Sequence, residues 1–512
     1  MSVDTSLEPR PAKDFGYREA QHLLQRAGFD ANPQAVAQLA ERGRDDAIKR
    51  LVAYQRIKAP ELEEFEVSRD LVPYLTEREQ ALYEKAKQRE KAMKQMGQMN
   101  MEQMAPDVAE KLRKRKEKAK REDRQAFDRL QRWWFKRMVN TPRPLEERLT
   151  LLWHDHFATS YDKVDDTYLM YRQNRVLRRL AGDNFGKLVH AVIRDPAMIQ
   201  YLDNHKNRKR HPNENLAREL LELFTLGEGQ YSEYDIKQAA RALTGLTYED
   251  NEPAFRKQWH DDGQKVIFGQ RGKFGPNELV NLILRRRGCS EYVAFKLYQH
   301  FVADVPEDTA QMPPWAIRVM RQLAAELRAH EYDLRPVLEK LFRSRHFYDP
   351  AVVGKKVKSP IQLTVGTIRS MNTPTRDLGQ VRRAMRRMGQ ELFKPPNVAG
   401  WPSGRAWINS STLFVRQNLC AYLITGKYQG QSSRPNDQTP FDPNALLSQL
   451  NAQKPKMATN ELIDRFVGPH APEARREPIV RFAKDHAGNR LGGDTLKSLL
   501  VLITAMPEYQ LH

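Results

Sequence analysis

The stretch HPNENLARELLELFTLGEGQYSE, residues 211–233, carries the helical pattern that decides the fold. On a helical wheel its leucines, Ala217 and Phe224 form one apolar arc, and its charged residues form one polar stripe. Asn213 is the expected N-cap, and Gly227 or Gly229 the expected end. Because an amphipathic helix needs other elements on which to bury its apolar arc, this stretch predicts a helical domain.

The rest of the chain predicts a mainly α fold: a large multi-helix domain with a small β-hairpin element and an inserted basic helical arm. Apolar residues recur at three- and four-residue steps in most segments. The one segment that favours extended structure is FRKQWHDDGQKVIFGQRGKFG, residues 255–275, where glycines separate short apolar pieces.

Composition shifts along the 512 residues divide the chain into five predicted parts. They are a helical cap (1–62), a charged Met- and Lys-rich helical arm (63–125), a helical core domain (126–427), a linker or long loop (428–460), and a C-terminal helical segment packed on the core (461–512).

The charge balance favours anionic partners. Lys and Arg number 85 against 65 Asp and Glu, which gives a net charge of +20. The two cysteines lack the short paired spacing of zinc sites, and no apolar run is long enough for a membrane span. The first residues lack a secretory signal pattern, so we expect a cytoplasmic protein, unless a leader was removed before export.

Basic residues are densest in KLRKRKEKAKR, residues 111–121. Arg113, Lys114, Arg115 and Lys116 are candidates for contact with nucleic acid or another anionic surface. A solvated helical face explains the same pattern, and we favour it because no aromatic residue is interleaved for base stacking.

The polar stripe of residues 214–222 is a candidate site. Ion pairs of Arg218 with Glu214 and Glu222 would explain most of it as helix stabilisation. Glu219 is different, because it lies at the border of the apolar arc, one turn from Asn215. We therefore predict Glu219 and Glu222 as metal ligands or a general base, Arg218 as an anchor for an anionic substrate, and Asn215 as a substrate contact.

Two histidine-containing motifs supply further candidates. In WHDHF, His154 and His156 could share a metal with Glu219 only if the helix ends by Trp153; the alternative is packing in the core. In HDDGQK, turn formation is one explanation of the sequence. A loop site is the other, with His260 as a catalytic residue and Asp261 and Lys265 as substrate contacts.

The segment PPNVAGWPSGRAWINSS, residues 395–411, has too many prolines and glycines for a helix. Trp401 and Trp407 either wedge between helices or line a pocket for a ring-shaped ligand, with Arg405 as a polar partner.

Several of these blocks together resemble the bacterial family called domain of unknown function 1800. The resemblance rests on LLWHDHFATS, DPAMIQYLDNHKN, the 212–245 block, HDDGQKVIFGQRGKFG, KVKSPIQL, the 388–413 block and ITAMPEYQL. It implies a mainly helical protein without an established activity, from a family that is often exported. It also implies a partner from the family domain of unknown function 1501, whose members are often encoded beside it and resemble alkaline-phosphatase-like hydrolases.

Two functional hypotheses follow. In the first, the protein is an enzyme, hydrolytic or oxidative, whose polar site, with or without a divalent metal, forms where WHDHF, NENLAREL and HDDGQK converge. The chain contains no phosphate-binding loop, nucleophile elbow or dinucleotide fingerprint. In the second, it is a noncatalytic helical scaffold or maturation partner whose basic arm binds an anionic protein, polymer or nucleic acid.

Overall fold

The computed structural model describes residues 3–59, 64–69, 71, 79, 81–82, 84–85, 88, 108–427, 437, 439–450, 454–468, 471–488 and 490–512. The Met-rich part of the predicted arm, residues 93–104, lies outside the described residues, as do residues 428–436 in the predicted linker.

The fold is mainly α, as predicted. The first helices are α1 (Tyr17–Ala27), α2 (Pro33–Glu41), α3 (Arg44–Val52), α5 (Val108–Asn140), α6 (Pro144–His156), α7 (Tyr161–Val164), α8 (Thr167–Leu180), α9 (Phe185–Val192), α10 (Pro196–Tyr201), α11 (Asn215–Leu221) and α12 (Glu233–Ala242). The others are α13 (Pro276–Leu284), α14 (Arg287–Phe301), α15 (Pro314–Ala329), α16 (Leu334–Arg343), α17 (Pro360–Met371), α18 (Leu378–Arg387), α19 (Ser410–Thr425), α20 (Asn444–Leu447), α21 (Pro455–Phe466), α22 (Glu473–His486) and α23 (Gly493–Ala505).

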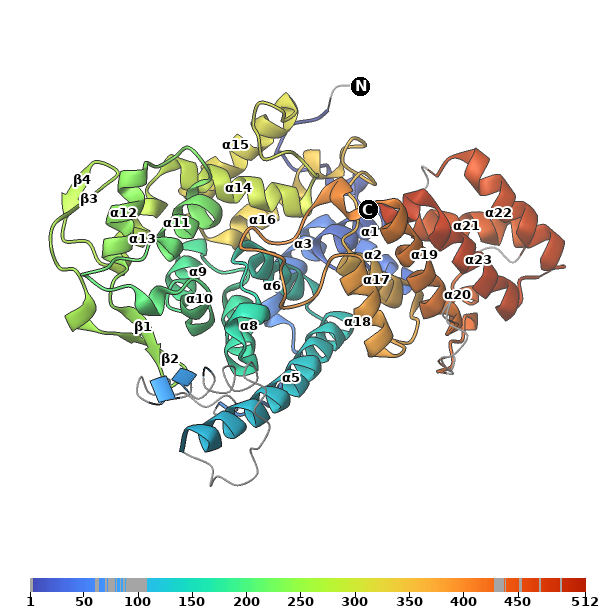
Figure 1. Ribbon diagram of the computed structural model, residues 1–512. Coiled ribbons are helices and arrows are strands. Elements are labelled where there is room, and N and C mark those ends of the chain that lie inside the picture. Colours follow the sequence, from blue (N-terminus) through green and yellow to red (C-terminus); the bar gives the residue numbers. More distant parts are fainter. Residues whose placement is uncertain are drawn as a thin grey trace, which may run out of the picture.

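The helices form an elongated body (Figure 1). Helices α11–α13 and the strands lie at one end, α20–α23 lie at the other, and α5 runs along one side. Two hydrophobic clusters correspond to the central and C-terminal parts. Ile361 and Leu419 belong to the large cluster, whereas Leu363 and Cys420 belong to the C-terminal one. Helices α17 and α19 therefore join the two cores.

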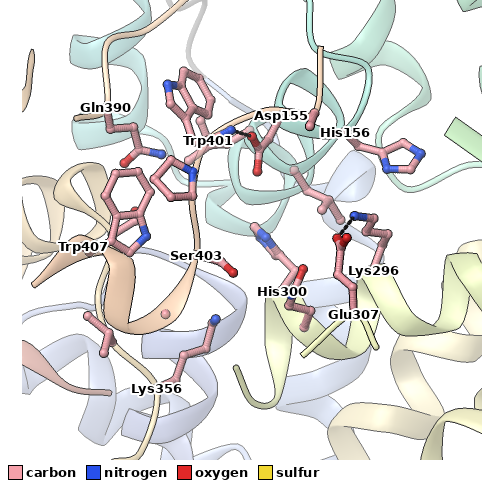
Figure 2. A pocket seen from close by; sticks show the side chains of 18 of the residues that line it. Asp155, His156, Lys296, His300, Glu307, Lys356, Gln390, Trp401, Ser403 and Trp407 are labelled. Atoms are coloured by element: carbon pink, nitrogen blue, oxygen red, sulfur yellow. Dashed lines mark hydrogen bonds and ion pairs between the residues drawn. The ribbon is translucent and has the colours of Figure 1, made fainter. Parts of the chain in front are cut away.

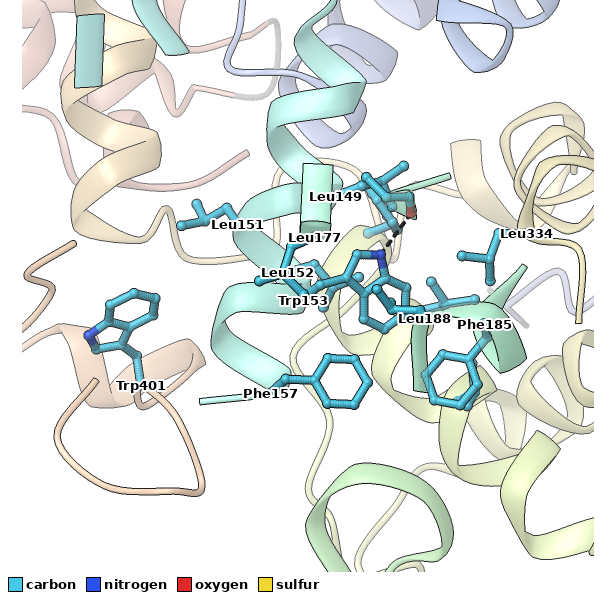
Figure 3. Packing of buried hydrophobic residues seen from close by; sticks show 14 of the residues in the cluster. Leu149, Leu151, Leu152, Trp153, Phe157, Leu177, Phe185, Leu188, Leu334 and Trp401 are labelled. Carbon is cyan, nitrogen blue, oxygen red and sulfur yellow. Dashed lines mark hydrogen bonds between the residues drawn. The ribbon is translucent and has the colours of Figure 1, made fainter. Parts of the chain in front are cut away.

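Helix α6 runs through the centre of the large cluster. Of its residues, only Pro144 and Asp155 are not buried. The Trp153 indole is fully buried near Phe157 and Phe185, and its Nε1 donates to the carbonyl of Ala181 at 2.7 Å (Figure 3). This bond satisfies the one polar atom of the side chain, so the ring can be buried completely.

The buried carboxylate of Glu147 on α6 is compensated by a closed network. Arg178 donates to both of its oxygens, at 2.7 and 3.0 Å. Trp134 Nε1 donates at 2.9 Å, and Arg137 Nε at 2.5 Å. Because every acceptor position has a donor, the charge on Glu147 is tolerated inside the helical core.

Two small antiparallel hairpins interrupt the helices. One pairs β3 (Lys265–Ile267) with β4 (Gln270–Gly272), inside the predicted extended segment. The other pairs β1 (Leu246–Glu249) with β2 (Glu252–Phe255) and was not predicted. Its turn residues, Asp250 and Asn251, have φ of 46° and 61°, the left-handed conformation of a type I′ turn. The acidic residues and the proline of this segment are uncommon in strands, so its sequence does not indicate extended structure.

Helix α11 begins one residue later than its sequence predicts, because Glu214 rather than Asn213 is the N-cap. The Asn213 side chain accepts the backbone N–H of Asn215 at 2.9 Å. After Leu221 the helix widens into one π-helical turn, Glu222–Leu226, and Gly227 ends it with φ of 80°. The last carbonyls of this turn therefore need partners from other elements.

Helix α5 continues without a break from Val108 to Asn140, across position 125, where we placed a domain boundary. The five-part division stays a prediction. Within the described part of the chain, no helix has the length and apolar character needed to cross a membrane.

Candidate functional site

A cavity of about 370 Å³ lies between α6, α14 and the 395–407 loop (Figure 2). Arg148, Leu151, Leu152 and Asp155 line it from α6, and Tyr292, Lys296, Gln299 and His300 line it from α14. Both sets have the i, i+3, i+4, i+7 type of spacing that places residues on one helical face. One face of each helix therefore forms a wall.

Asp155 connects α6 to the loop. Its Oδ1 accepts the backbone N–H of Trp401 at 2.6 Å (Figure 2). The preceding residue, Gly400, has φ of +88°, and a Cβ there would lie 2.7 Å from the Asp155 carbonyl oxygen. Only glycine fits this conformation and this close approach.

The Asp155 carboxyl titrates near neutrality. Burial raises its pKa to about 7, although the Trp401 N–H and the charge of Lys296 act in the opposite direction. A carboxyl with this pKa can both hold and release a proton near pH 7.

An ion pair forms the rim of the cavity opposite the loop. Lys296 Nζ lies 2.9 Å from Glu307 Oε1 (Figure 2) and 5.0 Å from the Tyr292 ring centroid. The Tyr292 hydroxyl donates to the Leu223 carbonyl at 2.9 Å, in the π-helical turn. This contact ties the rim to the end of α11.

The deeper wall is basic. Arg148, His300 and Lys356 line it, and Lys356 forms an ion pair with Asp304. Burial lowers the pKa of Lys356 and of His300, and nearby cations lower both further.

The structure does not assemble the predicted metal ligands His154, His156 and Glu219. Because α6 continues to His156, the two histidines have different neighbours. Rings of Trp134, Phe393 and Trp401 surround His154, whereas His156 Nε2 lies 2.9 Å from the Phe224 carbonyl, to which it donates. Burial lowers the pKa of each to about 3. No three His, Cys, Asp or Glu residues among those described could hold a metal ion.

The WHDHF segment meets the π-helical turn that follows NENLAREL, through ring packing on Phe224 and a backbone contact. His156 caps a carbonyl of the π-helical turn, which is a structural role. Glu219 is half-buried, and its pKa is raised by burial and then by Glu222. Glu222 accepts the Tyr231 hydroxyl at 2.6 Å.

The other predicted residues of α11 form surface contacts. Arg218 donates to both carboxylate oxygens of Glu233 at 2.8 Å, and Asn215 is exposed. Glu219, Glu222, Arg218 and Asn215 do not line the cavity. The predicted ion pair of Arg218 with Glu214 forms at 3.4 Å, whereas Arg218 pairs with Glu233 instead of Glu222. These contacts stabilise the helix.

The HDDGQK residues hold a turn together. His260 Nδ1 lies 2.8 Å from the Thr244 carbonyl, and Asp261 pairs with Arg241 at 2.6 Å. Buried Lys265 donates to the carbonyls of Asp261 and Gly263. His260, Asp261 and Lys265 do not line the cavity, which contradicts a site shared with WHDHF.

The tryptophan loop packs against the core and also lines the cavity, and a ring-shaped ligand for it stays a prediction. Trp401 packs on His154, with ring centroids 5.5 Å apart, and also borders the cavity. Trp407 lines the cavity, whereas Arg405 is exposed and does not.

Our sequence reasoning missed Asp155, Arg148, Lys296, His300 and Lys356. For Asp155 the signal was available, because it stands between two histidines in a helix of otherwise buried residues. Arg148 shares its helical face at a spacing of seven. The contributions of α14 and of Lys356 depend on long-range packing, which no local pattern reports.

The basic segment of α5 is a solvated helical face in its described part. Arg113 pairs with Glu110 and Glu117, both at 2.8 Å. Lys114 and Arg115 are exposed, and Lys116 is half-buried. Binding of an anionic partner by these side chains stays a prediction.

Comparison with known proteins identifies the family. Residues 22–511 match the model of a family described as "Protein of unknown function (DUF1800)". The chain belongs to the DUF1800 family. The match covers the cavity, α11 and both hairpins, so these features lie inside the DUF1800 region. No curated protein and no solved structure matches the chain significantly.

Proposed function

We propose that the protein is an enzyme that binds a small polar substrate in the 370 Å³ cavity and transfers a proton through Asp155. The observation that carries the proposal is the position of Asp155, a carboxyl of pKa about 7 at the wall of a cavity. General acid–base catalysis is most effective when the pKa of the group lies near the working pH.

Hydrolysis is the reaction class that these residues support best. A neutral Asp155 carboxyl can donate its proton to the leaving oxygen as the bond from that oxygen to the substrate breaks and a water oxygen bonds in its place. The resulting carboxylate can then accept the proton that the added water releases, which restores the neutral carboxyl. Lys296 lies close enough to affect the Asp155 charge and would stabilise the carboxylate formed after the first transfer. The WHDHF motif thus stays part of the proposed site, but through Asp155 rather than through its histidines.

The test is a panel of 4-nitrophenyl compounds: the acetate, butyrate, phosphate, sulfate and glucoside. We expect the protein to release nitrophenolate from at least one, at a rate that falls as pH rises above about 7 because Asp155 loses its proton. Asp155→Asn should lower that rate by about a hundredfold or more. Release from none of the compounds, or an unchanged rate in Asp155→Asn, would contradict the proposal.

Asp166→Asn is the matched control. Burial raises the pKa of Asp166 also to about 7, but its carboxylate accepts the N–H of Leu169 at the start of α8 and does not line the cavity. Asn can make the same cap. We therefore expect Asp166→Asn to keep the full rate.

A second candidate function is a noncatalytic scaffold or maturation partner that binds an anionic protein, polymer or nucleic acid. The supporting observation is a stripe of exposed cations on one face of α5, Lys111, Lys114, Arg115, Lys118 and Arg121. A protein of the family domain of unknown function 1501 is the partner that the family resemblance suggests.

The charge-reversed variant Lys114→Glu/Arg115→Glu/Lys118→Glu tests this candidate. We expect it to weaken binding to double-stranded DNA or polyglutamate and to reduce the salt dependence of binding. The control changes the same charge at the exposed residues Lys49, Arg50 and Arg285. Equal loss in both variants would mean that only net charge matters and would contradict a specific surface on α5.

A further inference from the structure

We propose that the deep wall of the cavity is an oxyanion site, in which Arg148, assisted by Lys356, binds the carboxylate, phosphate or sulfate group of a small ligand. The inference deepens the proposed function by naming the substrate class. It depends on the same cavity but not on turnover by Asp155.

Arg148 is a buried cation without a counter-charge. It is 2% exposed, and its Nε is buried without a hydrogen-bond partner. In the part of the chain that the structure describes, no carboxylate forms an ion pair with it. The Phe29 ring, 5.4 Å from the guanidinium carbon, covers one side, and the side chain borders the cavity.

Burial and the neighbouring Arg26 lower the pKa of Arg148 to about 9. The guanidinium therefore keeps its proton at neutral pH. An unpaired buried charge destabilises the folded state, and a bound anion would offset much of that destabilisation.

The neighbourhood holds more positive than negative charge. Arg26, Arg148 and Lys356 act on one another, and Asp304 is the carboxylate that opposes them. Lys356 pairs with Asp304, and Arg26 donates to the carbonyls of Val302 and Val352 at 2.6 and 2.8 Å. Lys356 and Arg26 therefore have partners within the protein, whereas the Arg148 guanidinium is available to bind a ligand.

The other titratable groups of the cavity do not cancel this charge. His300 is neutral at pH 7, because burial and the adjacent cations hold its pKa well below its usual value. Glu307 forms an ion pair with Lys296, and the raised pKa of Asp155, about 7, lowers the negative charge of that carboxyl near neutral pH. The cavity as a whole therefore favours an anion.

The remaining walls define the body of the ligand. Leu151, Leu152, Val305 and Val357 supply apolar surface, and Trp407 supplies a ring. The volume of about 370 Å³ suits a small molecule. In Figure 2, Asp155 and Lys356 lie on opposite sides of the open space. A ligand with its oxyanion on the basic wall would extend its apolar or ring-shaped part toward Asp155 and the loop.

Calorimetric titration of the full-length protein tests the site, with inorganic phosphate, phenyl phosphate, benzoate and benzyl alcohol as probes. We expect phosphate to bind, and phenyl phosphate to bind more tightly because its ring contacts the apolar wall. Benzoate should bind, whereas benzyl alcohol, which has the same ring without the charge, should not. Absence of phosphate, phenyl phosphate and benzoate binding, or equal binding of benzoate and benzyl alcohol, would overturn the inference without any variant.

Arg148→Met removes the charge and keeps an apolar side chain. We expect it to lower phosphate affinity by about tenfold to a hundredfold, the loss typical of a charge-assisted hydrogen bond. The matched control is Arg416→Met, because Arg416 is equally buried but donates to Gln510 at 2.8 Å and does not line the cavity. Phosphate affinity that is unchanged in Arg148→Met would contradict the site.

The result can be separated from that for catalysis. Asp155→Asn should keep phosphate binding while it loses turnover, and Arg148→Met should lose phosphate binding. If phosphate binds through Arg148 but no nitrophenyl compound is hydrolysed, the oxyanion site stands and the proposed acid–base function fails.

Discussion

Asp155 Oδ1 accepts the backbone N–H of Trp401 at 2.6 Å, and this bond joins α6 to a loop 246 residues later in the chain. The contact places the two segments around one cavity, with the carboxyl on one wall and Trp407 on another. It also requires glycine at position 400, because a Cβ there would collide with Asp155.

Gly400→Ala should destabilise the loop. A side chain at φ of +88° is strained, and its Cβ would contact both the carboxylate and the backbone oxygen of Asp155. We expect the free energy of unfolding, measured with urea, to fall by about 1–3 kcal/mol. Gly229→Ala is the control, since Gly229 has φ of +78° with no atom within 4 Å of the added Cβ. An equal loss in both variants would show that the approach to Asp155 is unimportant.

Asp155 should make stability depend on pH. Burial raises its pKa in the folded protein to about 7, so the folded state binds this proton more tightly than the unfolded chain. The contribution of Asp155 to stability is therefore fully present below about pH 4 and is lost as pH rises to about 7.

Asp155→Asn should remove this loss. Relative to the wild type, we expect the variant to gain about 1–2 kcal/mol in unfolding free energy between pH 5 and pH 8, a value discounted for partial exposure of the carboxyl. The exposed Asp262→Asn serves as control and should show no such gain. Parallel pH curves for wild type and Asp155→Asn would refute the assignment.

Glu147→Ala should be among the most destabilising substitutions in α6. It removes the buried carboxylate that Arg178 and Arg137 both bind, and it leaves Trp134 Nε1 without an acceptor. Breaking such a pair typically costs about 3–5 kcal/mol. Chemical denaturation would measure the loss. The control Glu117→Ala removes an exposed i,i+4 pair on α5 and should cost less than about 1 kcal/mol.

His156→Ala should lower stability by the same amount with and without a metal chelator. Its Nε2 caps the Phe224 carbonyl, so the variant loses a hydrogen bond and packing in the core, and no metal contact. We expect about 2–4 kcal/mol from thermal or urea unfolding. The metal hypothesis would be restored if the wild type were more stable than His156→Ala only when metal is present and this difference vanished with the chelator.

The helical fold was predictable because its signals are local. The apolar arc of α11, the Asn213 side chain that accepts a backbone N–H at its start, and its end at Gly227 are all encoded within a short stretch of sequence. The β1–β2 hairpin was missed because its turn residues, Asp250 and Asn251, give a weaker signal than the usual Asn-Gly pair. The family could also be identified from sequence, since its motifs are continuous blocks.

The site was predictable only in part. WHDHF and the tryptophan loop were identified, and both contribute to the cavity. The predicted metal ligands have other roles. His154 packs against the Trp401 ring, His156 caps the Phe224 carbonyl, and Glu219 is a half-buried residue of α11. The position of Asp155 between two histidines is visible in the sequence, but its raised pKa is not, because that depends on burial by segments that are remote in sequence.

The sequence by itself determined the helices, most of their ends, the family and the basic character of the chain, because periodicity, capping residues and charge act over short distances. Only the tertiary structure decided which polar groups share a cavity and which are satisfied. Arg148 and Asp155 are ordinary members of a helix in the sequence. They become candidates for function because packing removes water from both, leaves one without a counter-charge and moves the pKa of the other toward neutrality.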